Sequence, residues 1–157
     1  MSEEIIRIAN CSGYYGDKLS AAKDMLDGGP IDVLTGDYLA ELTMTILYNQ
    51  KLTRGEDKGY VGTFLKQIKE IAHTCKSKNI KVVTNAGGLN PQSMANEIEK
   101  ILAELKIDLK VAYITGDDLM PRMDDLIQLN EPFNNIDKGT PLQESDCHTL
   151  TANAYLG

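Results

Sequence analysis

Residues 81–91 read KVVTNAGGLNP, and this stretch indicates the fold class of the chain. A short β-branched run ends at Thr84 and is followed by turn-forming residues, which is typical of a buried strand. Two glycines allow a sharp turn, Asn90 suits a helix N-cap, and Pro91 suits the first helical position. The stretch therefore predicts a strand that leaves through a glycine turn into a helix, which is the basic unit of an α/β sheet.

The same unit recurs three more times along the chain. Strands are predicted over residues 5–10, 31–35 and 109–114, and each is followed by a loop that contains glycine. The four loops read SGYYGD (12–17), TGDY (35–38), TNAGGLNP (84–91) and TGDD (115–118). Between the strands, apolar residues recur at helical spacing. The clearest stripe comprises Val61, Phe64, Leu65, Ile68, Ala72 and Cys75.

This alternation predicts an α/β fold, namely a three-layer α/β/α sandwich around a mainly parallel, Rossmann-like sheet. One domain over residues 1–157 is the expected count for a chain of this length. A short helix is predicted from Pro121 to Leu129. Residues 130–146 are polar and rich in turn formers, so no regular element is expected there.

Composition excludes several classes of protein. The formal charge of −7 argues against nucleic acids and anionic membrane surfaces as partners. No apolar run reaches the roughly 18 residues of a membrane span, and the start MSEEIIRIAN does not resemble a signal peptide. Cys11, Cys75 and Cys147 are odd in number and far apart, which favours reduced thiols in the cytoplasm over disulfides.

Ligands of parallel α/β sheets bind beyond the carboxyl ends of the strands, so the four loops are expected to share one edge. As catalytic residues at that edge we predict Asp37, Asn85 and Asp117. As substrate-binding residues we predict Ser12, Gly13, Gly16, Asp17, Gly36, Tyr38, Gly87, Gly88, Asn90, Gly116 and Asp118. The structural alternative is that Asp17, Asp37 and Asn90 cap helices, the glycines shape turns and the tyrosine ring packs.

The chemistry of this edge leaves the ligand open. Helix N-termini and glycine amides favour phosphate or carboxylate, by about 0.3–1 kcal/mol. Two like charges about 4 Å apart oppose each other by roughly 4 kcal/mol at an effective dielectric constant of 20. An anion beside inward-facing aspartates would therefore need a basic side chain or a bridging cation such as Mg²⁺, for which no ligand spacing is specified. The cofactor stays unassigned.

Standard motifs are absent from the sequence. Residues 13–16 (GYYG) are not the dinucleotide fingerprint GxGxxG, and neither a P-loop nor a GxSxG elbow occurs. A nucleotide- or NAD-dependent enzyme is therefore only a further alternative, based on the order of elements. Cys11, at a strand end, is a candidate nucleophile, but a buried structural cysteine is the alternative.

The loops, in this order, resemble the acyclic terpene utilisation AtuA-like family. The blocks that carry the resemblance are IANCSGYYGD (8–17), GGPIDVLTGDYLAELTM (28–44), YVGTFLKQ (60–67), KVVTNAGGLNP (81–91), ITGDDL (114–119) and TANAYLG (151–157). The resemblance implies a role in the breakdown of acyclic terpenes such as citronellol and geraniol, where the intermediates are branched acyl-CoA thioesters. It implies no agreed catalytic residues.

The leading hypothesis is therefore a protein that binds or transforms an acyl-CoA-type metabolite, by lyase, hydratase or thioester chemistry. Members of the family are longer than this chain, so we expect it to be the N-terminal portion of a longer family domain. That expectation raises a second hypothesis, a non-catalytic component of a larger enzyme assembly. A homo-oligomer, or a partner that supplies the remainder of the domain, is then expected.

Overall fold

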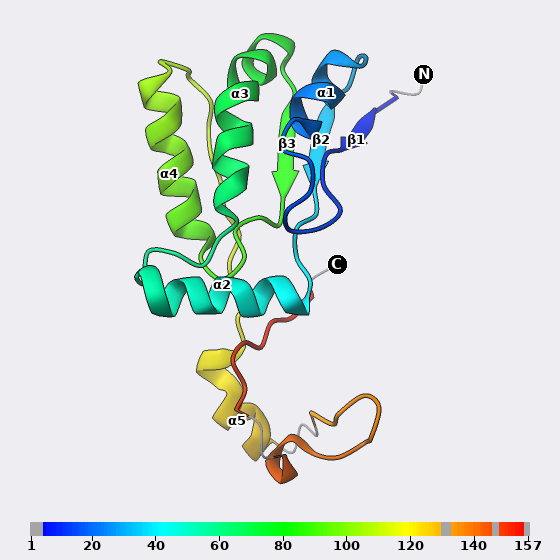
Figure 1. Cartoon of the computed structure of the whole chain (residues 1–157), viewed down its shortest axis with the longest axis vertical. Helices are drawn as coiled ribbons and strands as arrows, with labels where there is room; N and C mark the ends of the chain where they lie inside the picture. Colours follow the sequence, from blue (N-terminus) through cyan, green and yellow to red (C-terminus); the bar gives the residue numbers. More distant parts are fainter. Residues whose placement is uncertain (1–4, 130–132, 146–147, 156–157) are drawn as a thin grey trace. The chain divides into compact units, whose positions relative to one another are not determined.

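The computed structural model describes residues 5–129, 133–145 and 148–155. The chain forms two compact units, Met1–Ile114 and Thr115–Gly157, and the expectation of one domain over 1–157 stays a prediction. None of the helices within the described ranges is both long enough and apolar enough to span a membrane. The elements of the first unit are β1 (Ile8–Asn10), α1 (Ala21–Asp27), β2 (Val33–Gly36), α2 (Glu41–Arg54), α3 (Gly62–Lys78), β3 (Lys81–Thr84) and α4 (Pro91–Glu104) (Figure 1). Those of the second unit are the helix α5 (Met123–Gln128) and the 3₁₀ turns Met120–Arg122 and Leu142–Glu144.

The three strands form a parallel sheet in the order β1-β2-β3, which confirms the α/β class. Ile8 is aligned with Val33, and Val33 with Lys81. The strands are shorter than the sequence predicts, because residues 5–7 and 31–32 precede the first paired positions. The strand and helix start predicted from residues 81–91 are both observed, as β3 and α4.

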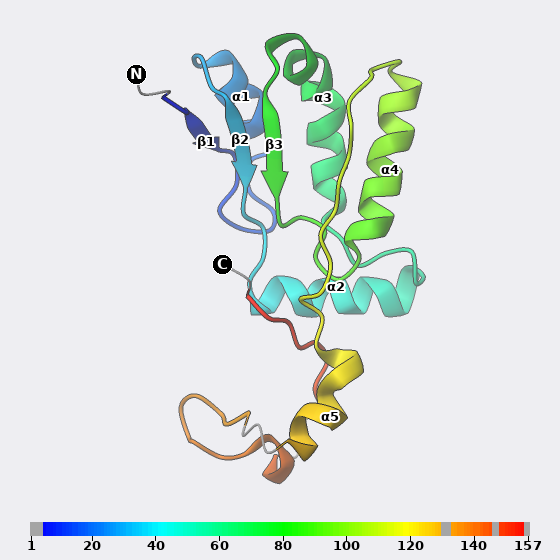
Figure 2. The ribbon, with the colours of Figure 1, turned by 180° about the vertical axis from the view of Figure 1, so that it is seen from behind.

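Helices α1 and α3 cover one face of this sheet. Because the strands lie side by side in chain order, right-handed crossovers put each connecting helix on the same side. Figures 1 and 2 show α1 and α3 over one face, with the strands nearest the viewer in the reverse view. On the opposite face Ile8 is 66% exposed and Val83 is 59% exposed, whereas Leu34 is fully buried under the helices. The second helical layer of a three-layer sandwich therefore stays a prediction.

The fourth strand, predicted over residues 109–114, is not observed as a strand. The segment after α4 is extended, and Ile107, Leu109 and Val111 point into the core at every second position. Within the described part of the chain, residues 110–114 make no backbone hydrogen bond to β3. The prediction of a strand over residues 109–114 is therefore wrong, because an alternation of apolar residues reports which face a side chain takes and not whether the backbone pairs.

The core lies between the sheet and its helices. Its largest fully buried side chains are Leu26, Leu34, Leu47, Val61, Phe64 and Ile71. Leu26 comes from α1, whereas Phe64 and Ile71 lie on the buried face of α3, which also includes Ile68, Ala72 and Cys75 of the predicted stripe. The predicted stripe of α3 is therefore the face that packs against the sheet.

A salt bridge between Arg7 and Asp32 joins the starts of β1 and β2. Nε and Nη2 of Arg7 donate to the two carboxylate oxygens of Asp32 at 3.0 and 2.9 Å, and the backbone N–H of Arg7 donates at 2.7 Å. The backbone N–H groups of Asp32 and Val33 donate back to the carbonyl of Arg7. These hydrogen bonds from Arg7 lower the pKa of Asp32 from 3.8 to about 2.

This salt bridge predicts a loss of stability in acid. Because the pKa of Asp32 is lower in the folded than in the unfolded chain, its contribution is complete above pH 3.8 and is lost as the pH falls towards 2. We expect Asp32→Asn to lower the free energy of unfolding at pH 7 and to flatten its decline below pH 4. Urea unfolding at a series of pH values measures this. Asp108→Asn, which removes a carboxylate that is 97% exposed and forms a 3.7 Å ion pair with Lys76, is the matched control.

Candidate functional site

The carboxyl ends of the three strands bring Ser12, Asp37 and Asn85 together. The backbone N–H of Asp37 donates to the carbonyl of Ser12 at 3.0 Å, which joins the ends of β1 and β2. Thr84 Oγ1 donates to the carbonyl of Gly36 at 2.8 Å, which joins the ends of β2 and β3. Residues that are far apart in the sequence are thus fixed next to each other by the parallel register.

Asp37 and Asn85 form a hydrogen-bonded pair at this edge. Asn85 Nδ2 donates to Asp37 Oδ1 at 2.6 Å, and Asn85 Oδ1 accepts from the backbone N–H of Tyr38 at 2.8 Å. Both residues are exposed, and Asp37 Oδ2 has no hydrogen-bond partner within the described ranges. An amide carries no charge, so the pair orients the carboxylate without neutralising it. The free oxygen can accept a hydrogen bond or a proton from a ligand.

The side chain of Tyr38 lies in the core. Its hydroxyl donates to Gln67 Oε1 at 2.5 Å, and its ring packs edge-on against Phe64 with the ring centroids 5.8 Å apart. Burial raises the pKa of the Tyr38 phenol, so the hydroxyl stays protonated and acts as a donor. A Cβ on Gly36 would lie 2.7 Å from the Tyr38 ring, so glycine makes room for that ring. Both residues were predicted to bind substrate, but they have structural roles here that account for their identity.

The first loop folds around the carboxylate of Asp17. Its two oxygens accept from the backbone N–H groups of Gly13, at 3.1 Å, and Lys18, at 2.7 Å. These hydrogen bonds lower the pKa of Asp17. Asp17 does not cap α1, which begins three residues beyond Lys18. The amides of Gly13 and Lys18 are therefore occupied by the protein itself, while Gly16, at φ 95°, provides the turn.

Helix α2 packs on the glycine turn after β3. A Cβ on Gly88 would lie 2.3 Å from Leu47 Cδ1 and 2.9 Å from the carbonyl oxygen of Gly59, and Gly88 has a φ of 52°. A Cβ on Gly87 would lie 2.7 Å from Pro91 Cβ. Figure 1 shows α2 lying across the carboxyl ends of the strands. Both glycines were predicted to contact ligand. The close approach of the protein's own chain is a structural reason for glycine at both positions.

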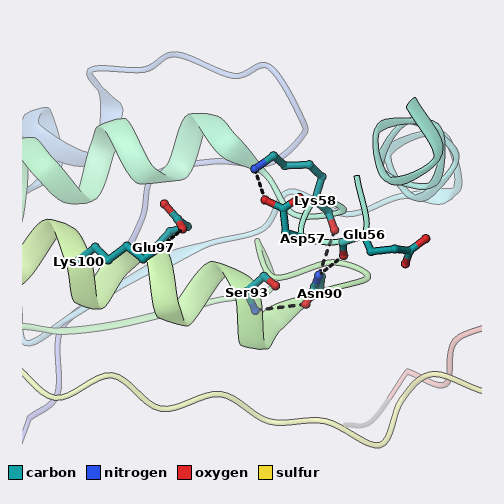
Figure 3. A network of polar contacts seen from close by, with 7 residues as sticks. All are labelled: Glu56, Asp57, Lys58, Asn90, Ser93, Glu97 and Lys100. Atoms are coloured by element: carbon teal, nitrogen blue, oxygen red, sulfur yellow. Dashed lines mark hydrogen bonds and ion pairs between the residues drawn. The ribbon is translucent and has the colours of Figure 1, made fainter. Parts of the chain in front are cut away.

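Asn90 joins two loops as well as capping α4, as Figure 3 shows. Its Oδ1 accepts from the backbone N–H of Ser93 at 3.2 Å, which is the cap that the sequence indicates. Its Nδ2 donates to the carbonyls of Glu56 at 2.9 Å and Lys58 at 3.2 Å. The amide thus holds the charged loop that precedes α3. Among Asp17, Asp37 and Asn90, the helix-cap alternative applies only to Asn90.

The predicted residues Gly116, Asp117 and Asp118 belong to the second unit. Asp117 Oδ2 accepts from Asn153 Nδ2 at 3.0 Å, and the backbone N–H of Ala154 donates to the carbonyl of Asp117 at 2.7 Å. Asp118 Oδ1 accepts from the backbone N–H of Met120 at 2.9 Å, and Gly116 has a φ of 116°. The role of these three residues in ligand binding stays a prediction.

Two residues that form hydrogen bonds to predicted site residues were not predicted from the sequence. Gln67 is 3% exposed and binds Tyr38, and its Nε2 donates to the carbonyl of Leu19. No sequence signal indicates this role, because a glutamine beside an apolar stripe is typical of a helix surface. Asn153 holds Asp117 and lies in the block TANAYLG, which marks it as a residue of interest without indicating its partner.

Cys11 is buried beside the Tyr38 hydroxyl, 3.9 Å from Sγ to oxygen. Burial raises the pKa of its thiol, which disfavours the reactive thiolate. Among the described residues, no three His, Cys, Asp or Glu side chains are grouped to hold a metal ion. The Mg²⁺ option thus rests on oxygen-ligand chemistry alone.

A family model described as "Acyclic terpene utilisation family protein AtuA" matches residues 6–157. No curated protein matches the chain, and no solved structure matches it.

Proposed function

Since the chain belongs to the acyclic terpene utilisation family AtuA, we propose that it binds or transforms an acyl-CoA-type metabolite of acyclic terpene breakdown at the Asp37–Asn85 pair. Membership associates the chain with acyclic terpene utilisation. The observation that supports the site is the 2.6 Å hydrogen bond at the carboxyl ends of the strands, which leaves one oxygen of an exposed carboxylate without a partner among the described residues.

The free oxygen of Asp37 is suited to proton transfer. Lyase, hydratase and thioester reactions on a branched acyl chain each need a group that takes or gives a proton near the thioester, and a positioned carboxylate can do so. Asn85 cannot reorient without breaking its bond to the backbone of Tyr38. The proposed division of roles is therefore that Asp37 reacts or accepts a hydrogen bond and Asn85 orients it. The catalytic role predicted for Asp117 is tested by a separate variant, Asp117→Asn.

We expect the phosphate end of the ligand to contribute little binding affinity through the first loop, residues 12–17. A phosphate there would have to displace Asp17 from the amide of Gly13. A pantetheine thioester, which keeps the acyl end and lacks the nucleotide phosphates, should therefore retain most of the affinity of the acyl-CoA. A large loss with the pantetheine thioester would contradict this part of the proposal.

The direct test is Asp37→Asn. We expect this variant to bind a branched acyl-CoA thioester at least tenfold more weakly, because the amide replaces the only charged acceptor of the pair. Titration calorimetry and thermal shift measure the change, and a ligand at 100 times its dissociation constant should stabilise the wild type by about 2.7 kcal/mol. Asp108→Asn, which makes the same change on an exposed side chain, should bind like the wild type.

Two outcomes would reject the proposal. The first is a wild-type protein that shows no heat and no thermal shift with acyl-CoA, free CoA or pantetheine thioesters. The second is an Asp37→Asn variant with unchanged affinity. NAD, NADP, ATP and Mg²⁺ complete the panel, so that a nucleotide- or metal-dependent function would be detected in the same experiment.

A component of a larger assembly is the second candidate function, and the open face of the sheet favours it. Parallel sheets are normally covered on both faces, yet Ile8 and Val83 are largely exposed. A second copy or a partner segment would supply the missing layer. Light scattering that found a monomer, together with full ligand binding by that monomer, would contradict this alternative.

A further inference from the structure

The chain contains the same short motif twice, once in each compact unit. Residues 35–39 read TGDYL and residues 115–119 read TGDDL. An Asn-Ala dipeptide follows each motif later in the chain. It begins at Asn85 after the first motif and at Asn153 after the second. The spacing between the Asp and the Asn is 48 residues in the first unit and 36 in the second. The repeat is therefore one of local motif and not of whole domains.

Both copies of the motif form the same chemical pair. Asn85 Nδ2 donates to one oxygen of Asp37 at 2.6 Å, and Asn153 Nδ2 donates to one oxygen of Asp117 at 3.0 Å. In the second unit, two backbone hydrogen bonds fix the segments, from Ala154 to the Asp117 carbonyl at 2.7 Å and from Leu119 to the Ala152 carbonyl at 2.8 Å. The backbone on either side of Asn153 is thus fixed to the Asp117 segment, while the side-chain amide of Asn153 orients the aspartate.

Other aspartates of the chain are bound differently. Both oxygens of Asp32 are bonded to Arg7, which also neutralises the charge. Both oxygens of Asp17 accept from backbone N–H groups of its own loop. Asp37 and Asp117 each accept a hydrogen bond from a neutral amide of a distant segment. Each also has one carboxylate oxygen with no partner among the described residues. Within the described part of the chain, that arrangement leaves a charged acceptor oxygen without a donor.

We propose that Asn153 is the positioning residue of Asp117, as Asn85 is of Asp37. The amide of Asn153 selects one orientation of the Asp117 carboxylate and leaves Oδ1 available to a ligand. The consequence for ligand binding rests on the proposed function of Asp117, whereas the pairing itself stands on the geometry. The two parts can therefore be tested separately.

The pairing is tested on the full chain without any ligand. In Asp117→Asn, a neutral acceptor replaces the charged one, so the side-chain amide protons of Asn153 should shift in a ¹H–¹⁵N spectrum and exchange faster with water. Asn153→Ala identifies those resonances. Asp124→Asn, an exposed aspartate of the same unit, should leave them unchanged. Resonances that do not respond to Asp117→Asn would overturn the proposal.

The functional part is tested by a double-mutant cycle with a branched acyl-CoA thioester. Asn153→Ala and Asp117→Asn should each weaken binding at least tenfold, and the double variant should be no weaker than Asp117→Asn alone, because Asn153 acts through Asp117. Asn134→Asp, at an exposed asparagine of the same unit, is the control for a change of charge. Melting curves verify that each variant is folded.

The outcomes separate the two proposals. Additive losses, or an Asn153→Ala variant that binds like the wild type while Asp117→Asn does not, would overturn the positioning role and leave the proposed function standing. If Asp37→Asn and Asp117→Asn both bind like the wild type, the proposed function fails, and the amide resonances alone then decide the assignment of Asn153.

Discussion

Replacing Gly88 by alanine is expected to destabilise the protein by about 2–5 kcal/mol. A Cβ at this position would lie 2.3 Å from Leu47 Cδ1 and 2.9 Å from the carbonyl oxygen of Gly59. The leucine end can move, but Leu47 is fully buried and the carbonyl belongs to the backbone. Overpacking costs about 1–3 kcal/mol, and the left-handed φ of 52° adds about 1–2 kcal/mol. Urea unfolding measures the sum.

Two other glycines separate the causes of this loss. Gly16 has a φ of 95° and open space around its Cβ position, so Gly16→Ala should cost only the backbone strain of about 1–2 kcal/mol. Gly13 has open space and no positive φ, so Gly13→Ala should change stability by less than about 0.5 kcal/mol. A Gly88→Ala variant no less stable than Gly16→Ala would show that the packing of α2 leaves room for a Cβ at Gly88.

Asn85→Asp is expected to lower the free energy of unfolding more strongly as the pH rises. The contribution of Asp32, by contrast, is lost as the pH falls. The change leaves an acceptor for the backbone N–H of Tyr38 and brings a second carboxylate to within 2.6 Å of Asp37. Two charges about 4 Å apart repel by roughly 1 kcal/mol in water and 4 kcal/mol at an effective dielectric constant of 20. Because both residues are exposed, we expect a loss of about 1–3 kcal/mol at pH 7.

The sign of the pH dependence follows from the repulsion. The pair binds a proton more tightly in the folded chain than in the unfolded one, so its folded pKa is raised. The loss relative to the wild type should therefore disappear below pH 4 and grow as the pH rises towards neutral. Equilibrium unfolding between pH 3 and pH 8 measures it, and a loss independent of pH would indicate a packing defect instead.

The exchanged variant, Asp37→Asn with Asn85→Asp, distinguishes fold from function. It restores an amide–carboxylate pair, so most of the stability lost by Asn85→Asp should return. The carboxylate now follows β3 and not β2, so ligand binding should remain weak. Recovery of stability without recovery of binding would support Asp37 as the functional group. Recovery of both would mean that the pair serves the fold and that the position of the charge is immaterial to binding.

The sequence predicted those elements whose signals are local. In residues 81–91 the strand, the glycine turn and the N-cap by Asn90 all depend on neighbours within a few residues. The pairing of residues 109–114 depends instead on whether their backbone meets β3, which periodicity does not report. The strand order likewise arises from long-range contacts, so the one-sided placement of the helices was not foreseen.

The candidate site was predictable to a similar degree. The rule that strand ends meet at one edge correctly joined Ser12, Asp37 and Asn85. It could not indicate that the Tyr38 side chain turns into the core to bind Gln67, because ring packing and ligand contact leave the same sequence signal.

Helix α2 has a consequence for how such a protein can diversify. The connection between β2 and β3 needs one helix against the sheet, and α3 provides it, so α2 is an addition to the crossover. Its contacts with the strand-end loops include Leu47 at the glycine turn and Gln50, whose Nε2 donates to the Tyr15 hydroxyl at 3.2 Å. Its exposed positions, such as Leu42 and Leu52, are free to vary without altering strand register. Substitutions on the exposed side of α2 can therefore accumulate while the sheet and its Asp37–Asn85 pair are inherited unchanged.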